Sequence, residues 1–207
     1  GPGAVIRTGD NPSWVGAIYA LQEQLKLPVH IGGKSAIGYQ GHAHYLSLGE
    51  EIVTLYCPYK TDIPKWFLGY DWKINLKIKA KNLFLSRTDE GIKKRDIHGF
   101  PLMVASLELA ILEILADVPD NQTLDESFKI MESLNTLNPT LLQILLETCN
   151  SIKVKRLFLL LAEKANHQWL QRLKIEKIDL GSGNRVLYKS GTLNKKYKVT
   201  VPRDWAD

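Results

Sequence analysis

Period-two alternation of apolar and polar residues marks the first half of the chain. Ile74, Leu76 and Ile78 alternate with three lysines and Asn75 over residues 73–80, and residues 51–57 form a second strand-like run. Such alternation predicts strands with one half-buried face. The lysines of the first run indicate either a solvent-facing sheet surface or an edge strand guarded by charge.

Helices are predicted between these strands and before them. Trp14, Ile18, Leu21 and Leu25 recur at helical spacing and would form the buried stripe of the first helix. The elements expected in this region are a strand at 4–7, a helix from Pro12 to Pro28 capped by Asp10 or Asn11, a strand at 29–31 and a short helix at 34–39.

The pattern changes from strands to helices after residue 105. A charged connection from Arg87 to Asp96 precedes a strand over 97–105, which Pro101 interrupts. Capping residues and a proline then predict three helix starts: Ser106 for a helix through 115, Thr123 for a helix over 124–137, and Pro139 for a helix to about 150.

The most apolar helix is predicted over residues 151–165. Val154, Leu157, Phe158 and Leu161 recur at helical spacing, and two further leucines between them extend the apolar surface nearly all round. A helix that is apolar on all sides is typical of a protein interior. We therefore expect this helix inside the protein.

Three cations, Lys153, Lys155 and Arg156, crowd the first turn of this helix. The N-terminal end of a helix already carries partial positive charge, so cations are mildly unfavourable there. We therefore expect an anion nearby. It is either a phosphate of a nucleic acid or a carboxylate of a neighbouring helix, such as Glu147.

A basic β-hairpin is predicted after this helix. Residues 181–184 form a turn, and the runs 185–189 and 196–201 are expected to pair with each other. Alternation places Val186, Tyr188, Tyr197, Val199 and Val201 on an apolar face, and it places Arg185, Lys189, Lys196 and Lys198 on a face toward solvent or phosphate.

Charge is segregated along the sequence. Residues 151–207 contain 13 Lys and Arg against 5 Asp and Glu, a net charge of +8. The whole chain has a net charge of +5, so residues 1–150 sum to −3. A basic end on a nearly neutral body suits a polyanionic partner, although a solvated lysine face gives the same count.

Composition narrows the class of protein. The 207 residues, 44% hydrophobic and 24% charged, are in the globular range, and no apolar run approaches the ~20 residues of a membrane span. Cys57 and Cys149 lie far apart in sequence, which suits free thiols in a reducing cytoplasm. We therefore expect a soluble cytoplasmic protein. Gly1, Pro2 and Gly3 are typical of the scar that a cleaved tag leaves.

Catalytic and metal-binding patterns are weak throughout. His42 and His44, with His30, lack an identifiable additional metal ligand, and the Gly181-Ser182-Gly183 segment does not open a helix after a strand as a dinucleotide fingerprint would. Ser106 near Glu108 is better explained as a helix cap. We assign no catalytic, cofactor-binding or metal-binding residue.

A nuclease remains the alternative from another function class. Asp71 and Lys73 at a strand start resemble the acidic-x-Lys end of a metal-dependent nuclease motif, and the basic C-terminal third would suit such an enzyme. The partner acid that binds the metal is not identifiable in the sequence. The alternative is therefore a metal-dependent enzyme that processes nucleic acids.

The expected fold class is α+β. A mixed sheet with flanking helices forms the N-terminal half, followed by a helical middle and a C-terminal β-hairpin. With residues 1–3 set aside, an α/β subdomain covers 4–105 and a helical subdomain with the closing basic hairpin covers 106–207. Together they would form one domain.

Ordered blocks over nearly the whole chain resemble a known family. These blocks are Trp14-Val15-Gly16 with Tyr19-Ala20-Leu21-Gln22, Gly32-Gly33 with Ala36, 41–46, Trp66-Phe67, 82–84, 110–113, Met131-Glu132, 153–159, 179–183 with Arg185, and Tyr197 with Thr200-Val201-Pro202. In this order they resemble the AbiEi antitoxins of type IV toxin-antitoxin (abortive infection) systems, which act in phage defence.

The resemblance implies a non-enzymatic bacterial antitoxin. Such a protein counters a nucleotidyltransferase-type toxin without stable binding, and it represses its own operon by binding operator DNA through a winged helix-turn-helix domain. The resemblance places that domain upstream, so the chain would be the C-terminal antitoxin domain without it. The nucleic-acid or partner contacts expected here are Lys153, Lys155, Arg156, Arg185, Lys189, Lys196 and Lys198. Neither a cofactor nor a membrane is implied.

Overall fold

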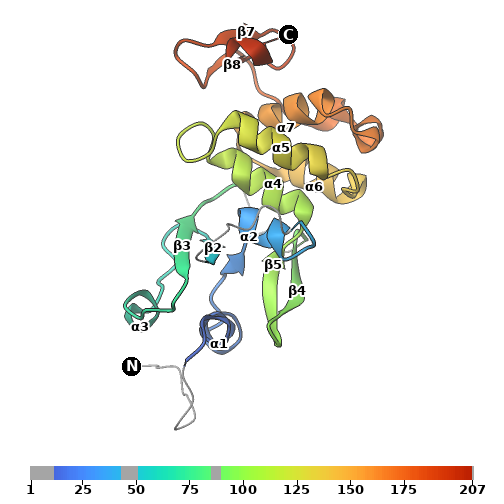
Figure 1. Ribbon diagram of the computed structural model, residues 1–207. Helices are drawn as coiled ribbons and strands as arrows, with labels where there is room; N and C mark the ends of the chain where they lie inside the picture. Colours follow the sequence, from blue (N-terminus) through green and yellow to red (C-terminus); the bar gives the residue numbers. More distant parts are fainter. Residues whose placement is uncertain (1–11, 43–50, 85–89, 207) are drawn as a thin grey trace. The chain divides into compact units, whose positions relative to one another are not determined.

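The computed structural model describes residues 12–42, 51–84 and 90–206 of an α+β protein (Figure 1). The chain forms two compact units. The first is drawn from Gly1–Asn82 and Ile92–Ser106, and the second from Leu83–Gly91 and Leu107–Asp207. Leu83, Phe84 and Gly91 thus group with the helices, although they precede part of the sheet in sequence.

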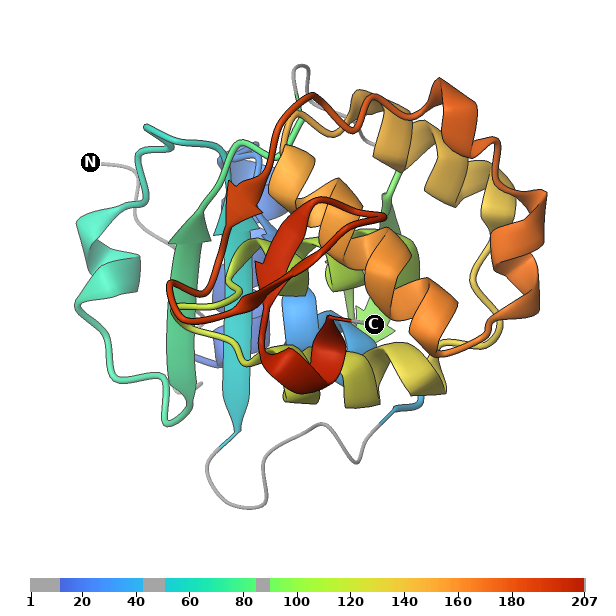
Figure 2. The ribbon, with the colours of Figure 1, turned by 90° about the horizontal axis from the view of Figure 1, so that it is seen from above.

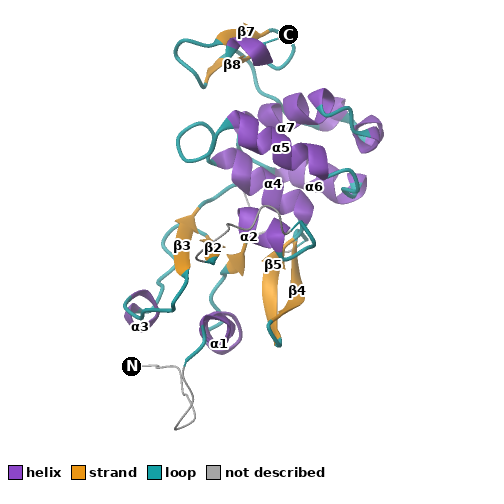
Figure 3. Cartoon of the chain, in the orientation of Figure 1, coloured by secondary structure: helices purple, strands orange, loops and turns teal. Residues whose placement is uncertain are grey.

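A mixed sheet is the centre of the first unit (Figure 3). Its described strands lie in the order β3-β2-β1-β5-β4, with β1–β5 and β2–β3 parallel and the other pairs antiparallel. The bounds are β1 His30–Ile31, β2 Ile52–Cys57, β3 Asn75–Ala80, β4 Ile92–Ile97 and β5 Phe100–Ala105. Residues of β2 and β5 such as Leu55, Leu102 and Val104 are fully buried, so the core follows the central strands.

Both edge strands of the described sheet are rich in lysine. Strand β3 alternates exposed and half-buried positions from Asn75 to Ile78, as its sequence pattern predicts. The prediction of a charged connection up to Asp96 is wrong over its second half, because Lys93, Lys94 and Arg95 belong to β4. An edge strand needs only one neighbour and tolerates charge on both faces, so it lacks the apolar alternation that identifies inner strands.

The first helix begins two residues later than predicted. Ser13 caps α1 (Trp14–Tyr19), and its Oγ accepts a hydrogen bond from the Gly16 N–H at 3.2 Å. Asp10, Asn11 and the predicted strand at 4–7 lie outside the described residues. Serine is a strong cap in its own right, so Pro12 precedes the cap instead of occupying the first turn. The helix continues as the π-helical turn η1 (Ala20–Gln24).

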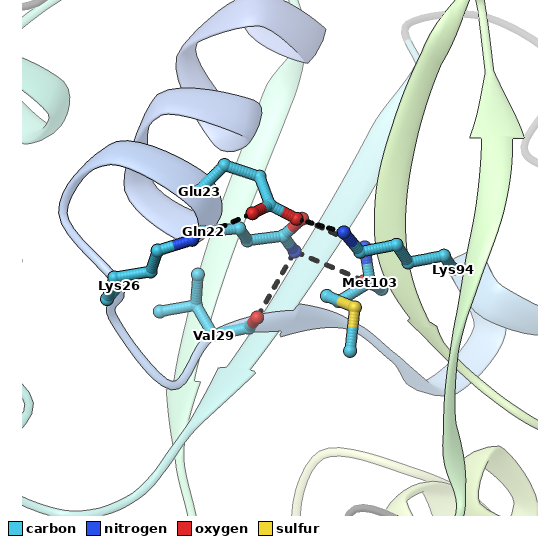
Figure 4. A network of polar contacts seen from close by, with 6 residues as sticks. All are labelled: Gln22, Glu23, Lys26, Val29, Lys94 and Met103. Atoms are coloured by element: carbon cyan, nitrogen blue, oxygen red, sulfur yellow. Dashed lines mark hydrogen bonds and ion pairs between the residues drawn. The ribbon is translucent and has the colours of Figure 1, made fainter.

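The π-helical turn contains a buried side chain that completes the sheet (Figure 4). Gln22 Nε2 donates to the carbonyls of Val29 at 3.1 Å and Met103 at 3.2 Å, and Gln22 Oε1 accepts from the Met103 N–H at 2.8 Å. Strand β1 is bridged to β5 at Ile31 and Val104. The Gln22 amide therefore satisfies the adjoining backbone groups of Met103 as another strand would.

Glu23, the next residue, bridges two lysines on the surface (Figure 4). Its carboxylate pairs with Lys94 of β4 and with Lys26. Hydrogen bonds from Lys94 first, and then from Lys26, lower the pKa of Glu23 to about 2. This glutamate links the helix to the edge of the sheet and offsets part of the positive charge there.

The second unit is built on helices α4 (Leu107–Ala116), α5 (Leu124–Ser133), α6 (Pro139–Thr148) and α7 (Ile152–Lys164). Helix α4 packs against the other three (Figure 1). Thr123, Asn138 and Ser151 cap α5, α6 and α7 with side-chain oxygens that accept hydrogen bonds from first-turn N–H groups. Helix α5 ends earlier than predicted, with Leu134 as its cap residue.

Among the helices described, none is long and apolar enough to cross a membrane.

Helix α7 lies in the core of this unit, as its composition predicts. Every residue from Val154 to Ala162 is buried, and Leu157, Phe158 and Leu161 have no exposed surface. The helix packs against α4, α5 and the C-terminal sheet. Cys149, just before the helix, is free and buried, as is Cys57 of the first unit, which confirms the prediction of two free thiols.

The C-terminal segment differs from the predicted hairpin. Its described strands are β6 (Arg185–Val186), β7 (Thr192–Asn194) and β8 (Val199–Val201), in the order β6-β8-β7. Figure 2 shows this end of the chain in orange-red to red. Strand β6 pairs with β8 in parallel, and the antiparallel partner of β8 is β7. Both predicted runs contribute to one sheet, but the intervening residues supply a third strand that pattern alone did not distinguish from a turn.

Burial within this sheet follows the prediction only in part. Tyr197, Val199 and Val201 are buried as expected. Val186 is 68% exposed, so its expected place on the apolar face is wrong. Strand β6 is two residues long and pairs at the edge of the sheet, which leaves both of its residues in solvent.

Truncation of the core of α7 tests this packing. Leu157→Ala removes a fully buried side chain and is expected to lower the free energy of unfolding by about 2 to 5 kcal/mol. Chemical denaturation followed by circular dichroism measures the loss. The exposed Leu68 provides a matched control, because Leu68→Ala is expected to change the free energy of unfolding by less than about 1 kcal/mol. Equal effects of the two substitutions would contradict a core position for α7.

Candidate functional site

Lys153 holds the end of another helix. Its Nζ donates to the carbonyl oxygens of Ala116 at 2.8 Å and Val118 at 2.6 Å, at and just beyond the C-terminus of α4. The last carbonyls of a helix lack intrahelical partners and carry partial negative charge. The C-terminal end of α4 is thus the negative partner that was expected near Lys153. Glu147, the expected carboxylate, instead accepts a hydrogen bond from Gln143 at 2.6 Å.

Arg156 is the largest fully buried side chain among the described residues. The residue is 1% exposed, and its guanidinium donates four hydrogen bonds to backbone carbonyls. The acceptors are Leu180 at 2.8 Å from Nε, Gly183 at 2.8 Å and Lys198 at 2.9 Å from Nη1, and Gly181 at 3.1 Å from Nη2. One side chain therefore joins α7 to the 180–183 turn and to the start of β8.

The charge of Arg156 is compensated by dipoles. Burial, and secondarily the nearby cation of Arg185, lower the pKa of the Arg156 guanidinium. A guanidinium remains protonated in proteins because its unperturbed pKa exceeds 12. Four carbonyl acceptors thus satisfy most of its five N–H donors, and within the described residues all of these acceptors belong to the backbone.

Lys155 is also inside the protein, at 2% exposure. It lies near Cys149, whose thiol pKa is raised by burial and lowered to a smaller degree by a backbone hydrogen bond at Ser151 and by the charge of Lys155. Lys155 and Arg156 therefore do not present their side chains to solvent. This corrects the expectation that they stand ready for an external anion, because the first turns of α7 are covered by other segments of the same unit.

The remaining predicted contact residues are exposed. Arg185, Lys189, Lys196 and Lys198 all have exposed side chains. Arg185 lies beside β8, opposite Val199 in the register, and its N–H donates to the Lys198 carbonyl at 2.8 Å. The structure thus brings Arg185 and Lys198 together. Contact of these residues with a nucleic acid stays a prediction.

Lys196 contacts a glutamate that sequence reasoning missed. The Glu163 carboxylate at the end of α7 pairs with the Lys196 ammonium and accepts a hydrogen bond from the Tyr197 hydroxyl at 2.6 Å. These two contacts lower the pKa of Glu163, with the Lys196 contribution the larger. The only signal in the sequence is an acid near the end of an otherwise apolar helix, which does not identify a partner 33 residues away.

A hollow of about 220 Å³ lies beside this contact. It is lined by Leu160, Glu163, Lys164, Asn194, Lys196 and Tyr197. Their polar groups are engaged within the fold: Lys164 donates to the Asp204 carbonyl at 3.1 Å, and the Asn194 side chain bonds the backbone of Tyr197 and Ala206. The hollow therefore lies where α7 packs against the C-terminal sheet, and its polar groups serve that packing.

The other candidate residues have structural contacts. Glu108 accepts a hydrogen bond from the Asn138 N–H at 2.8 Å and so fixes the start of α6. Asp71 and Lys73 pair with each other at 2.5 Å on the surface before β3 begins. His30 stacks on Tyr56, and His44 lies outside the described residues. Within the described ranges, no group of three or more His, Cys, Asp or Glu side chains could hold a metal ion.

Substitution of Arg156 tests whether its guanidinium holds the 180–183 turn and the start of β8 against α7. Arg156→Lys keeps the charge, but a single ammonium cannot reproduce the fork that reaches four carbonyls. We expect the free energy of unfolding to fall by about 3 kcal/mol or more, because buried carbonyls lose charge-assisted hydrogen bonds. Urea denaturation provides the measurement. Arg172→Lys, at an exposed position, is the matched control. If Arg156→Lys is no more destabilising than this control, the carbonyl contacts of Arg156 do not stabilise the fold.

Acid should loosen the contact between Glu163 and the C-terminal sheet. Because the folded pKa of Glu163 is lowered, its stabilisation is complete above the ordinary glutamate pKa of about 4.3 and disappears as pH falls through the lower folded value. Glu163→Gln removes the charge but keeps a hydrogen-bond acceptor for Tyr197. The stability difference between the native chain and this variant should therefore shrink from pH 7 to pH 3. A difference that stays constant over that range would contradict the assignment.

Comparison with known proteins identifies the family. Residues 50–202 match the family model described as transcriptional regulator, AbiEi antitoxin, type IV TA system. Residues 1–48 match the model described as transcriptional regulator, AbiEi antitoxin N-terminal domain. No curated protein matches the chain significantly.

A solved structure with the same fold supports the architecture. The crystal structure of the RV2827C protein from Mycobacterium tuberculosis superposes with a TM-score of 0.59 at 14% identity. The match covers 87% of this chain and 64% of that protein, so it bears on the fold alone. Since the family models match nearly all of the sequence, the chain belongs to the AbiEi antitoxin family of type IV toxin-antitoxin systems.

Proposed function

We propose that this chain is the antitoxic and regulatory part of a bacterial type IV toxin-antitoxin system. It counters a nucleotidyltransferase-type toxin, and it supports repression of its own operon together with a winged helix-turn-helix domain that reads operator DNA. The observation that carries this proposal is the match of residues 1–48 and 50–202 to antitoxin and transcriptional-regulator models. The action takes place in the cytoplasm, where free thiols such as Cys57 persist.

The antitoxic action is non-enzymatic in this proposal. The polar residues that sequence motifs singled out are engaged in structural contacts: Glu108 with the start of α6, Asp71 with Lys73, and Arg156 with backbone carbonyls. A catalytic group needs an approach to substrate and a partner that activates it. These contacts favour a protein that acts by binding or by regulation over a metal-dependent nuclease.

DNA contact is assigned to the exposed cations of the second unit. Arg185, Lys189 and Lys198 are exposed, whereas Lys155 and Arg156 are buried. Phosphate contacts position a protein on DNA but do not read the sequence. The second unit therefore adds affinity that is blind to sequence and sensitive to salt, and the winged-helix domain supplies operator choice.

Co-expression with the cognate toxin tests the antitoxic function. The full 207-residue chain is expected to restore growth of bacteria that express the toxin, and Arg156→Lys should reduce rescue in proportion to the folded protein that remains. Lys177→Gln, at an exposed cation, serves as the matched control and should rescue like the native chain. Colony counts and immunoblots measure growth and protein level together. Absence of rescue at a normal level of folded protein would refute the antitoxic function of this chain.

A toxin pull-down separates two modes of rescue. If the antitoxin acts without stable binding, the toxin should not copurify with the chain even when growth is restored. Copurification with restored growth would retain the antitoxin function and replace its indirect mode by direct neutralisation.

A further inference from the structure

The turn at residues 180–185 is shaped from its inner side by Arg156. The carbonyls of Leu180, Gly181 and Gly183 all accept hydrogen bonds from the same guanidinium. Three carbonyls within four consecutive residues thus converge on one buried cation. Gly181 and Gly183 have φ of +64° and +73°, a left-handed conformation that glycine adopts without strain and that this convergence uses.

The outer side of the turn presents backbone N–H groups. In a planar trans peptide, the N–H of each residue points opposite to the carbonyl before it. The N–H groups of Ser182 and Asn184 therefore point away from Arg156, and residues 181–184 are exposed. Within the described chain neither N–H has an intramolecular acceptor, whereas the Gly181 N–H donates to Asp179 Oδ1 at 2.8 Å. Two outward N–H groups on either side of the left-handed Gly183 offer an anion backbone donors of the kind that anion-binding nests use.

Two exposed cations, Arg185 and Lys198, lie at this turn. Within the described residues, neither forms an ion pair with a carboxylate. Arg185 is the last residue of the turn, and the carbonyl of Lys198 accepts a hydrogen bond from the Arg185 N–H. Both side chains are exposed. Arg185 is near enough to Arg156 for like-charge repulsion to lower the pKa of Arg156, in addition to the larger effect of burial. Asp179 is the acid next to the turn, and its carboxylate caps the Gly181 N–H.

The outer side is also open. A Cβ atom built on Gly183 would meet no atom within 4 Å, whereas one on Gly181 would meet Ile152 at 3.2 Å. The turn is thus closed on its inner face and accessible on its outer face. There is thus open space beside Gly183, between the two residues whose N–H groups point outward.

We propose that the turn at residues 180–185 is a phosphate-binding site, in which the N–H groups of Ser182 and Asn184 and the side chains of Arg185 and Lys198 hold a phosphate group. Donors on the backbone and charge from the side chains are the combination that phosphate-binding loops use. The phosphate belongs either to a nucleic-acid backbone or to a small free phosphate. The first source rests on the DNA contact proposed above, and the second does not.

Amide NMR of the ¹⁵N-labelled full chain tests the site directly. Inorganic phosphate is titrated at constant ionic strength, with sodium chloride as the balancing salt. The largest shifts are expected at the amides of Ser182, Gly183 and Asn184. Arg185→Gln should weaken phosphate binding about tenfold, since it removes a charge-assisted contact, while Lys177→Gln should leave binding unchanged.

A second variant examines the backbone without changing charge. Gly183→Ala has space for its methyl group but must strain a left-handed φ of +73°. It should weaken phosphate binding, and the spectrum away from residues 180–185 reports whether the fold is retained. Phosphate shifts spread evenly over surface lysines, or an equal loss in Lys177→Gln and Arg185→Gln, would overturn the site.

A short DNA duplex in place of phosphate identifies the source. Shifts of the same amides with both probes support a phosphodiester ligand, and shifts with inorganic phosphate alone support a free phosphate. Shifts with neither probe overturn the proposal. Growth rescue by the native chain is measured separately, so loss of the phosphate site and failure of the antitoxin function are distinguishable.

Discussion

The buried guanidinium of Arg156 is the constraint on which the second unit depends. Removing an ion of this size from water costs several kcal/mol, and a single weak partner would not offset that cost. Four carbonyls do so, but they come from Leu180, Gly181, Gly183 and Lys198, and each must be in place when the side chain is buried. The position of the turn and the start of β8 are therefore tied to α7 as one cooperative arrangement.

Polar residues at both ends of α7 likewise hold other segments of the second unit in place. Lys153 holds the C-terminus of α4 at one end, and Glu163 holds Lys196 and Tyr197 at the other. The apolar residues between them fill the core. Charge on this helix thus specifies which segments attach to it, while apolar burial supplies most of the driving force. The exposed cations of the C-terminal sheet are held in place as a consequence.

The sequence predicted which residues are buried better than it predicted which segments pair with each other. The periodicity of α7 indicates its place in the core, and the capping residue Thr123 marks a helix start, because both signals are local. The strand over Ile92–Ile97 was missed, since an edge strand with consecutive cations has no period to detect. The parallel pairing of β6 with β8 was missed too, because alternation assigns faces but does not choose a neighbour.

The same limit explains why buried and exposed cations looked alike. A lysine or arginine near a helix start predicts a negative partner, but a carbonyl satisfies that requirement as well as a phosphate does. The fold divides them: Lys153 and Arg156 bind carbonyls of their own chain, and Arg185 and Lys198 remain exposed. The division is causal as well. By drawing three carbonyls inward, Arg156 turns the N–H groups of Ser182 and Asn184 outward, so a buried cation shapes the surface available to an external anion.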